Sequence, residues 1–230
     1  RSKRIPISHL IGKREFFGFD YIVTSDVLDP RPDSESLIEL AFEIFPVQKY
    51  SANNNFKILE LGSGSGCLII TLLKYYNSAS AIASDISSKA LEICQANAAF
   101  HKLDQRLELV IGDLFDALKN SSNPKEKFDL IISNPPYIAS KDIELLEPEV
   151  KLYEPRIALD GGESGLDFYQ KIAIDAKNFL NKNGVLLLEI GQNQENQIIE
   201  IFNNQKFILQ KSKKDLSAIT RILCFKAISN

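Results

Sequence analysis

The sequence lacks methionine, long apolar runs and the apolar core of a signal peptide. Methionine is absent from all 230 residues, including the first, so we expect the chain to continue a longer polypeptide. No apolar run approaches the roughly 20 residues that cross a bilayer. The basic residues at the start are followed by Pro6 and His9 rather than by the apolar core of a signal peptide. From these features we expect a cytoplasmic protein with no membrane partner.

Cysteine is scarce, and positive charge is not in excess. Cys67, Cys94 and Cys224 are widely separated within apolar segments, which is typical of buried, reduced thiols. No cluster of cysteines or carboxylates has ligand spacing, so no metal site is predicted. The chain has 27 Lys and Arg against 30 Asp and Glu. This balance does not favour direct contact with nucleic acid, although basic residues gather at 211–214.

The sequence does contain a regular alternation of strand-like and helix-like segments. Residues 14–28 alternate aromatic and apolar groups around Gly18 and predict a small β-hairpin, which ends at 29–32. After it, the apolar periodicity changes repeatedly between that of strands and that of helices, which predicts βα winding in an α/β fold. We expect strands at 56–61, 80–85, 107–111, 128–133, 185–190, 207–210 and 219–227. We expect helices at 36–45, 65–76, 87–101, 169–180 and 194–202.

A glycine-rich turn follows the first strand of this winding. Its pattern is acid-x-Gly-x-Gly-x-Gly, with Glu60 as the acid, and its backbone N–H groups can bind a ligand because no Cβ blocks close approach. The third glycine falls one position too early for a dinucleotide fingerprint, and there is neither a P-loop nor a Gly-x-Ser-x-Gly elbow. The pattern resembles the first motif of S-adenosylmethionine-dependent methyltransferases with a Rossmann-like fold. The residues predicted to bind this cofactor are Gly62, Ser63, Gly64, Ser65 and Gly66.

Acidic residues at later strand ends support a nucleoside cofactor. Asp85 ends the second strand, where an acid accepts hydrogen bonds from both ribose hydroxyls. Asp113 and Leu114, after the third strand, would border the adenine as one polar and one apolar group, although an Asp at this place is equally typical of a helix N-cap. Because the glycine turn, these residues and Asn134 all follow strands of one sheet, we expect them on one edge.

The most informative stretch is Asn134-Pro135-Pro136-Tyr137, which directly follows the apolar run 128–133. Asn134 carries a side-chain carbonyl, and the prolines have no N–H, so their backbone carbonyls are free to accept hydrogen bonds. Such a rigid corner suits a planar NH2 group, whose hydrogens two acceptors can hold so that its lone pair faces an electrophile. Tyr137 would form an aromatic wall. A simple proline-rich turn is the alternative.

From this corner we predict both catalytic and binding residues. The predicted catalytic residues are Asn134, Pro135 and Tyr137. The same three, together with Pro136, are the predicted substrate-binding residues, and Asn134 is also a predicted cofactor contact.

Motifs along nearly the whole chain carry a family resemblance. They are 12–18 (GKREFFG), 31–35 (RPDSE), 134–138 (NPPYI), 154–156 (EPR), 161–166 (GGESGL), 189–191 (EIG) and 215–221 (DLSAITR). With these motifs the chain resembles the HemK/PrmC family. The resemblance implies a Rossmann-like class I methyltransferase fold: a seven-stranded, mostly parallel sheet whose last strand is antiparallel, preceded by the small β-hairpin.

The resemblance also implies an activity. That family transfers a methyl group from S-adenosylmethionine, leaving S-adenosylhomocysteine, to the side-chain amide nitrogen (N5) of the glutamine in the Gly-Gly-Gln loop of peptide-chain release factors. Release factors are therefore the implied partners. The resemblance places the cofactor at 62–66, its ribose at Asp85 and its adenine at Leu114, with the glutamine NH2 between Asn134 and the Pro135 carbonyl.

The resemblance divides the chain into two parts. Residues 1–33 are expected to be the β-hairpin and a linker that follow a helical domain preceding the chain, and residues 34–230 the catalytic domain. The resemblance also favours closure of Phe16 and Phe17 over the cofactor.

Two other functions remain open at this point. The Asn-Pro-Pro-Tyr corner is similar in methyltransferases that act on adenine or guanine, so an amino-methyltransferase of RNA or DNA is one alternative, which the acidic balance does not favour. A cofactor-binding module without activity is the other, and the intact Asn134 and Asp85 argue against it.

Overall fold

The computed structural model describes residues 4–53, 55–215 and 217–228. The first three residues of the predicted 1–33 segment, and Leu216 of the last motif, lie outside the described residues. Within the described ranges, no helix combines the length and the apolar character that a bilayer crossing requires.

A seven-stranded sheet forms the centre of the fold, in the order β5-β4-β3-β6-β7-β9-β8. The pairs from β5 to β7 are parallel, and β9 is antiparallel to both of its neighbours. The predicted sheet, with its antiparallel last strand, is therefore confirmed. The strands are β3 (Lys57–Leu61), β4 (Ser80–Asp85), β5 (Leu107–Ile111), β6 (Phe128–Ser133), β7 (Leu180–Glu189), β8 (Phe207–Lys214) and β9 (Thr220–Ala227).

Two strands are longer than the sequence pattern indicated. β7 begins at Leu180 rather than at 185, because Leu180 already pairs with Phe128 before a register shift. β8 continues through Lys214 rather than ending at 210. It lies at the edge of the sheet, where an exposed polar strand lacks the apolar alternation that reveals a strand in a sequence.

Helices connect the strands. The five predicted helices are present as α2 (Glu35–Ile44), α4 (Cys67–Tyr75), α5 (Ser88–Phe100), α7 (Asp167–Phe179) and α8 (Glu195–Asn204). Shorter helices were not predicted, because one or two turns give no readable periodicity. These are α1 (Ile7–Ile11), α3 (Val47–Tyr50) and α6 (Pro148–Tyr153), with the 3-10 helices η1 (Pro32–Ser34), η2 (Asp104–Arg106), η3 (Leu114–Asn120), η4 (Ile143–Leu145) and η5 (Arg156–Ala158).

Alternate side chains of the strands divide the core into two clusters. Ile58 and Leu130 belong to a first cluster beneath α2, α4 and α5, whereas Leu59 and Ile131 belong to a second beneath η3, α7 and α8. The central strands are therefore buried on both faces, as a parallel sheet requires. With both faces covered, the carboxyl edge of the strands is the place where a ligand can enter.

A two-stranded hairpin precedes the sheet. β1 (Lys13–Phe16) pairs antiparallel with β2 (Phe19–Ile22). The hairpin is shorter than the predicted 14–28, because the chain leaves it after β2 and runs toward the carboxyl edge of the sheet.

The aromatic residues of the hairpin do not reach the ligand edge. Phe16 is 1% exposed and packs edge-on against Tyr21. Phe17 packs edge-on against Phe42 and Tyr75, beside the first core cluster. The expectation that Phe16 and Phe17 close over a cofactor is therefore wrong for this structure, because burial against α2 and α4 outweighs exposure at the site.

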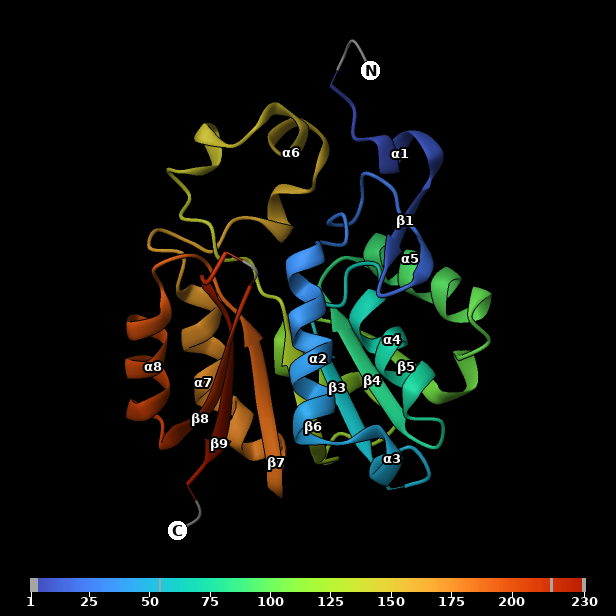
Figure 1. The fold of residues 1–230 in the computed structure, drawn as a ribbon, viewed down its shortest axis with the longest axis vertical. Helices are drawn as coiled ribbons and strands as arrows, with labels where there is room; N and C mark the ends of the chain where they lie inside the picture. The colour runs from blue at the N-terminus through green and yellow to red at the C-terminus, as the bar shows by residue number, and fades with distance from the viewer. Residues whose placement is uncertain (1–3, 54, 216, 229–230) are drawn as a thin grey trace.

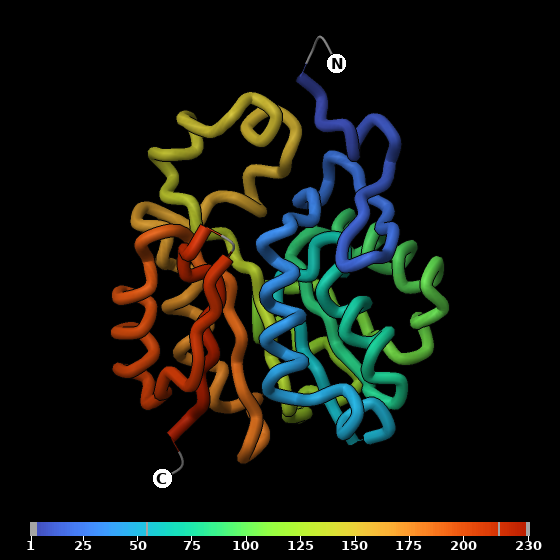
Figure 2. The backbone as a smooth tube through the Cα atoms, viewed as in Figure 1, coloured from blue at the N-terminus to red at the C-terminus, as the bar shows by residue number. Residues whose placement is uncertain are grey.

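Two chain segments rise over the carboxyl ends of the strands. In Figure 1 the arrow of β7 points toward the end of the molecule that carries α1 and the hairpin on one side and α6 on the other. Figure 2 shows the blue tube before α2 and the yellow tube after β6 passing over this same edge. We call residues 23–34 the linker segment and residues 138–166 the insert segment.

Candidate active site

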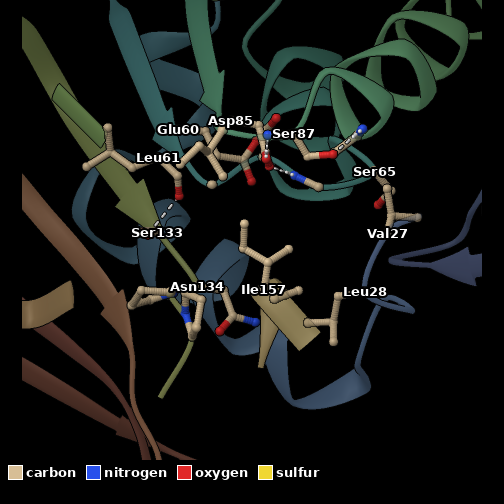
Figure 3. Close-up of a pocket in the computed structure, with 18 of the residues that line it drawn as sticks. Val27, Leu28, Glu60, Leu61, Ser65, Asp85, Ser87, Ser133, Asn134 and Ile157 are labelled. Carbon is tan, nitrogen blue, oxygen red and sulfur yellow. Dashed lines mark hydrogen bonds between the residues drawn. The ribbon is translucent and has the colours of Figure 1, made fainter. Parts of the chain in front are cut away.

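A cavity of about 230 Å³ lies at the carboxyl edge, where the strand order reverses between β3 and β6. Open α/β sheets bind ligands at such a reversal, because the loops after the two strands diverge. Figure 3 shows Asp85 and Ser87 on one side of this space and Asn134 on the other, with Leu28 and Ile157 reaching in from the covering segments. The predicted residues that line it are Gly62, Ser63, Gly64, Ser65, Asp85, Asp113, Leu114, Asn134, Pro135 and Pro136.

The glycine turn provides space at the cavity, and the N–H groups of its first three residues are engaged within the protein. The N–H groups of Gly62 and Ser63 both donate to the Ser84 carbonyl, at 2.8 and 2.9 Å, and that of Gly64 donates to Asp85 Oδ2 at 2.9 Å. These three N–H groups are therefore engaged within the protein, and ligand binding by the N–H groups of the turn stays a prediction. Gly62 and Gly64 have φ of +72° and +53°, and a Cβ at either would meet nothing within 4 Å. Their bare backbone forms an open cradle on the cavity.

Gly66 lies behind this cradle and does not line the cavity. Its φ is +76°, and a Cβ there would come within 2.4 Å of Cys94 Sγ. The third glycine therefore serves the close packing of α4 against α5, not ligand contact.

Asp85 lies at the end of β4 and holds the turn in place. Its Oδ2 accepts from Gly64 N and its Oδ1 from Ser87 N, each at 2.9 Å. Burial raises the pKa of this carboxyl above its ordinary value, against the lowering effect of these N–H donors. Each carboxylate oxygen has a further lone pair, so Asp85 can also accept hydrogen bonds from two hydroxyls of a ligand.

Asp113 and Leu114 border the cavity after β5. The Asp113 carboxylate lies 3.0 Å from Lys171 Nζ, and both side chains are about half exposed. Leu114 has φ of +46°, which is the left-handed region that a side chain rarely adopts. A strained residue at a ligand edge indicates that the chain is held there by its surroundings.

Asn134 directly follows β6 and is held from behind by a buried carboxylate. Its Nδ2 donates to Ser34 Oγ at 3.2 Å, and Ser34 Oγ donates to Glu189 Oε2 at 2.5 Å. Ser34 and Glu189 are 3% and 2% exposed. Burial raises the pKa of Glu189 to about 7.

Two acceptors of cavity-lining residues have no donor among the residues that the structure describes. In the part of the chain that the structure describes, no hydrogen bond ends on Oδ1 of Asn134 or on the carbonyl of Pro135. Both residues line the cavity. A planar NH2 group could therefore be held by two acceptors at the end of β6.

Tyr137 packs away from this pair. Its ring lies against the second core cluster and is not part of the cavity lining. Burial raises the pKa of Tyr137 to about 12, so its hydroxyl stays protonated at neutral pH. Its predicted role as a wall for the substrate stays a prediction.

The glycine-rich loop of the insert segment supports the corner from outside. Gly161 N donates to the Ile138 carbonyl at 2.8 Å, and Gln194 Nε2 donates to the Tyr137 carbonyl at 3.0 Å. A Cβ at Gly165 would lie 2.4 Å from that same Tyr137 oxygen. The 161–166 motif thus has a packing reason: it lets two backbones approach closely behind the prolines.

An ion pair joins the linker and insert segments at the cavity wall. Arg31 Nη2 lies 2.7 Å from both carboxylate oxygens of Glu154, whose side chain is 2% exposed. Burial raises the pKa of Glu154, and the adjacent Arg31 opposes that rise. Arg31 and Pro155 both line the cavity, so the pair fixes two parts of its wall.

Several lining residues were missed by sequence reasoning. Motifs 31–35 and 154–156 contained some of them, but gave no reason to place them here. Others carried no signal, because apolar residues in loops have no periodicity. Among the missed residues are Val27, Leu28, Arg31, Ser34, Pro155, Ile157, Ala158, Phe168 and Lys171.

The cavity fits the predicted cofactor. The cradle at Gly62 and Gly64 admits a chain that a Cβ would exclude, and Asp85 suits a diol. Leu114 and Ile157 offer apolar surface to a flat base. These are the features that a nucleoside with an attached side chain requires.

Comparisons with known proteins agree with this geometry. Residues 52–223 match a family model described as methyltransferase domain. Proteins named release factor glutamine methyltransferase from Agrobacterium fabrum and Clostridium acetobutylicum are 39% and 36% identical to this chain. The alignments cover 98% and 97% of this chain, and 76% and 75% of those proteins. The chain belongs to the release factor glutamine methyltransferases.

Solved structures of methyltransferases share the fold of this family member. A methyltransferase from Pyrococcus furiosus has a TM-score of 0.65 at 22% identity, covering 99% of this chain and 98% of that chain. The N-terminal domain of human METTL16, solved in complex with SAH, has a TM-score of 0.62 at 16% identity, covering 93% and 77%. At such identities the likeness concerns the fold alone, and the predicted methyltransferase fold is confirmed.

Gly165→Ala should destabilise the methyltransferase more than Gly18→Ala. Both glycines have φ near that of a left-handed residue, +75° and +78°, but a Cβ at Gly18 meets nothing within 4 Å. We expect a loss of about 1–2 kcal/mol for Gly18→Ala and about 2 kcal/mol more for Gly165→Ala, in urea unfolding. Equal losses would contradict the close approach of Gly165 to Tyr137.

Glu189→Gln should change how stability depends on pH. The unfolded carboxyl loses its proton near its ordinary pKa of 4.5, while the folded one keeps it to about 7. The stability that this group contributes is therefore complete below pH 4.5 and lost as the pH rises through 7. Between pH 4 and 8, the unfolding free energy of the native protein should fall by about 3 kcal/mol relative to Glu189→Gln. Parallel stability curves would contradict this.

Proposed function

We propose that this protein transfers the methyl group of S-adenosylmethionine to the side-chain amide nitrogen (N5) of a glutamine in the Gly-Gly-Gln loop of peptide-chain release factors. The observation that carries this proposal is the pair of donor-free acceptors, Asn134 Oδ1 and the Pro135 carbonyl, at the end of β6 in the cavity. The names of the relatives, release factor glutamine methyltransferase, support the same substrate.

The residues of the chain act by binding and orientation. S-adenosylmethionine, when bound, supplies a methyl carbon that its sulfonium activates. Asn134 and Pro135 accept hydrogen bonds from the glutamine NH2 and direct its delocalised lone pair. Pro135 and Pro136 fix the backbone, so the acceptors need no reorganisation during the reaction. Neither acceptor is a strong base, and we propose that the amide proton leaves to solvent after the methyl group has bonded.

Cofactor binding is assigned to the other wall of the cavity. We propose that Gly62 and Gly64 accommodate the cofactor, that Asp85 binds its ribose and that Leu114 borders its adenine. The product is then S-adenosylhomocysteine, and its presence in the METTL16 domain is consistent with a related cofactor site on this fold.

Charge placement favours a protein substrate over RNA or DNA. Two of the three lysines at 211–214 pair with acidic residues on α2. Lys211 lies 2.6 Å from Glu43, and Lys213 lies 2.8 Å from Glu43 and 2.9 Å from Glu39. Cations engaged in this way offer little to phosphates, which free Lys and Arg would bind.

We further propose the boundaries and the setting of the activity. Residues 34–230 form the catalytic domain, and residues 26–31 of the linker segment complete its cavity. Because release factors act on ribosomes, the methyltransferase is expected to work in the cytoplasm.

Asn134→Ala should abolish most of the activity and leave cofactor binding nearly unchanged. Loss of a preorganised acceptor should lower kcat by at least about 10²-fold. Calorimetric titration with S-adenosylmethionine tests binding separately, and Asn203→Ala, an exposed asparagine on α8, is the matched control. Equal rates for Asn134→Ala and the native protein would refute the role of Asn134.

Substrate class is decided by one labelling experiment. The protein receives isotopically labelled S-adenosylmethionine with a release factor, with RNA or with DNA, and peptide mass analysis locates the label. We expect label on the glutamine of the Gly-Gly-Gln loop. Label on adenine or guanine, with none on the release factor, would replace the proposal by the nucleic-acid alternative.

A further inference from the structure

Glu189 is a buried carboxylate that no part of the proposed mechanism has yet used. It ends β7, next to the strand that precedes Asn134, and a chain of two hydrogen bonds through one hydroxyl links it to Asn134, whose side chain also lowers the pKa of Glu189. Asn134 Nδ2 donates to Ser34 Oγ at 3.2 Å, and Ser34 Oγ donates to Glu189 Oε2 at 2.5 Å. Ser34 comes from η1, in the 31–35 motif, so the three residues come from three distant parts of the chain.

The chemistry of these groups gives the chain of hydrogen bonds a direction. A carboxylate only accepts hydrogen bonds, so the single proton of the Ser34 hydroxyl points to Glu189. Ser34 Oγ can then only accept on its other side, and the amide group of Asn134 must turn its NH2 toward it. Oδ1 is left facing away from Ser34, without a donor among the described residues.

Packing alone does not choose this orientation. The oxygen and NH2 of an amide have nearly the same size, so a half-turn of the Asn134 side chain is sterically permitted. The half-turn would present a donor to an incoming NH2 group, and two donors do not bind each other. Hydrogen-bond direction is therefore what decides whether the corner can bind a carboxamide.

We propose that Glu189 is a positioning residue: acting through Ser34, its carboxylate fixes the Asn134 amide with Oδ1 toward the substrate NH2. This inference rests on the proposed function for its consequence in catalysis. The hydrogen bonds themselves do not depend on the proposed function, because they are present in the protein without substrate.

The surroundings of Glu189 make its charge sensitive to pH. Charged and titratable neighbours are Asp33 on η1, Arg221 on β9, Tyr137 after β6, Tyr169 on α7 and Cys67 on α4. Burial raises the pKa of Glu189 to about 7, while Ser34, Arg221 and Asn134 oppose the rise. Arg221 is itself paired with Asp33 and Asp215, at 3.3 and 2.8 Å, and so compensates Glu189 only in part.

Protonation of Glu189 reverses the direction of these hydrogen bonds. A neutral Glu189 can donate to Ser34 Oγ, which frees the Ser34 proton for Asn134 Oδ1 and allows the half-turn. The native enzyme should therefore lose kcat as the pH falls through about 7.

The activity test uses Glu189→Gln and Ser34→Ala, alone and together. Gln keeps the size of Glu but offers both a donor and an acceptor, so it fixes no direction. Ala at position 34 removes the hydroxyl that links Glu189 to Asn134. We expect kcat at pH 8 to fall about 10-fold in each single variant, with a much smaller change in KM, and both variants to lose the decline near pH 7. The kcat of the double variant should be no lower than that of either single variant, because both substitutions break the same series of hydrogen bonds. Additive losses, or an unchanged pH profile in Glu189→Gln, would overturn the proposal.

A second readout needs neither cofactor nor substrate. In 15N-labelled protein, the side-chain NH2 signals of Asn134, assigned by their absence in Asn134→Asp, should shift with a midpoint near pH 7. The shift should be absent in Glu189→Gln and in Ser34→Ala. Flat signals in the native protein would overturn the proposal even if the protein methylates release factors. A clear titration without any methylation would instead count against the proposed function alone.

Discussion

The pairing of β3 with β6 is the interaction on which the rest of the site depends. Leu61 lies opposite Ser133 in parallel register, and Ser133 Oγ donates to the Leu61 carbonyl at 2.7 Å. The glycine turn and Asn134 therefore leave the sheet side by side, at the point where the strand order reverses. A slip of one residue would turn every side chain to the opposite face, so burial of both faces fixes the register and with it the site.

The corner after β6 is rigid because distant segments support it from several sides. The loop at 161–166 and Gln194 hold the backbone of Tyr137, while Ser34, 155 positions from Glu189, connects Asn134 to the core. The support has a thermodynamic cost, since a carboxylate taken out of water weakens the folded state when it ionises. The protein thus trades stability for a fixed direction of hydrogen bonding, as functional sites commonly do.

The sequence predicted the features that follow from local pattern and topology. Apolar periodicity located the strands, and the carboxyl-end rule located Asp85 and Asn134 on one edge. Local pattern could not show that the Ser84 carbonyl, from the neighbouring strand, accepts from the N–H groups of Gly62 and Ser63, because that contact is a property of the sheet. Nor could it predict that Phe16 packs inward, or that Ile157 reaches the cavity from a loop without periodicity.

The ion pair between Arg31 and Glu154 has a mechanical consequence. It joins residues 123 positions apart and connects the linker segment to the loop that carries Pro155. The linker and insert segments, which border the cavity, are therefore coupled and do not move independently. A movement of the backbone ahead of Arg31 would therefore be passed on to the loop that carries Pro155, at the other border of the cavity.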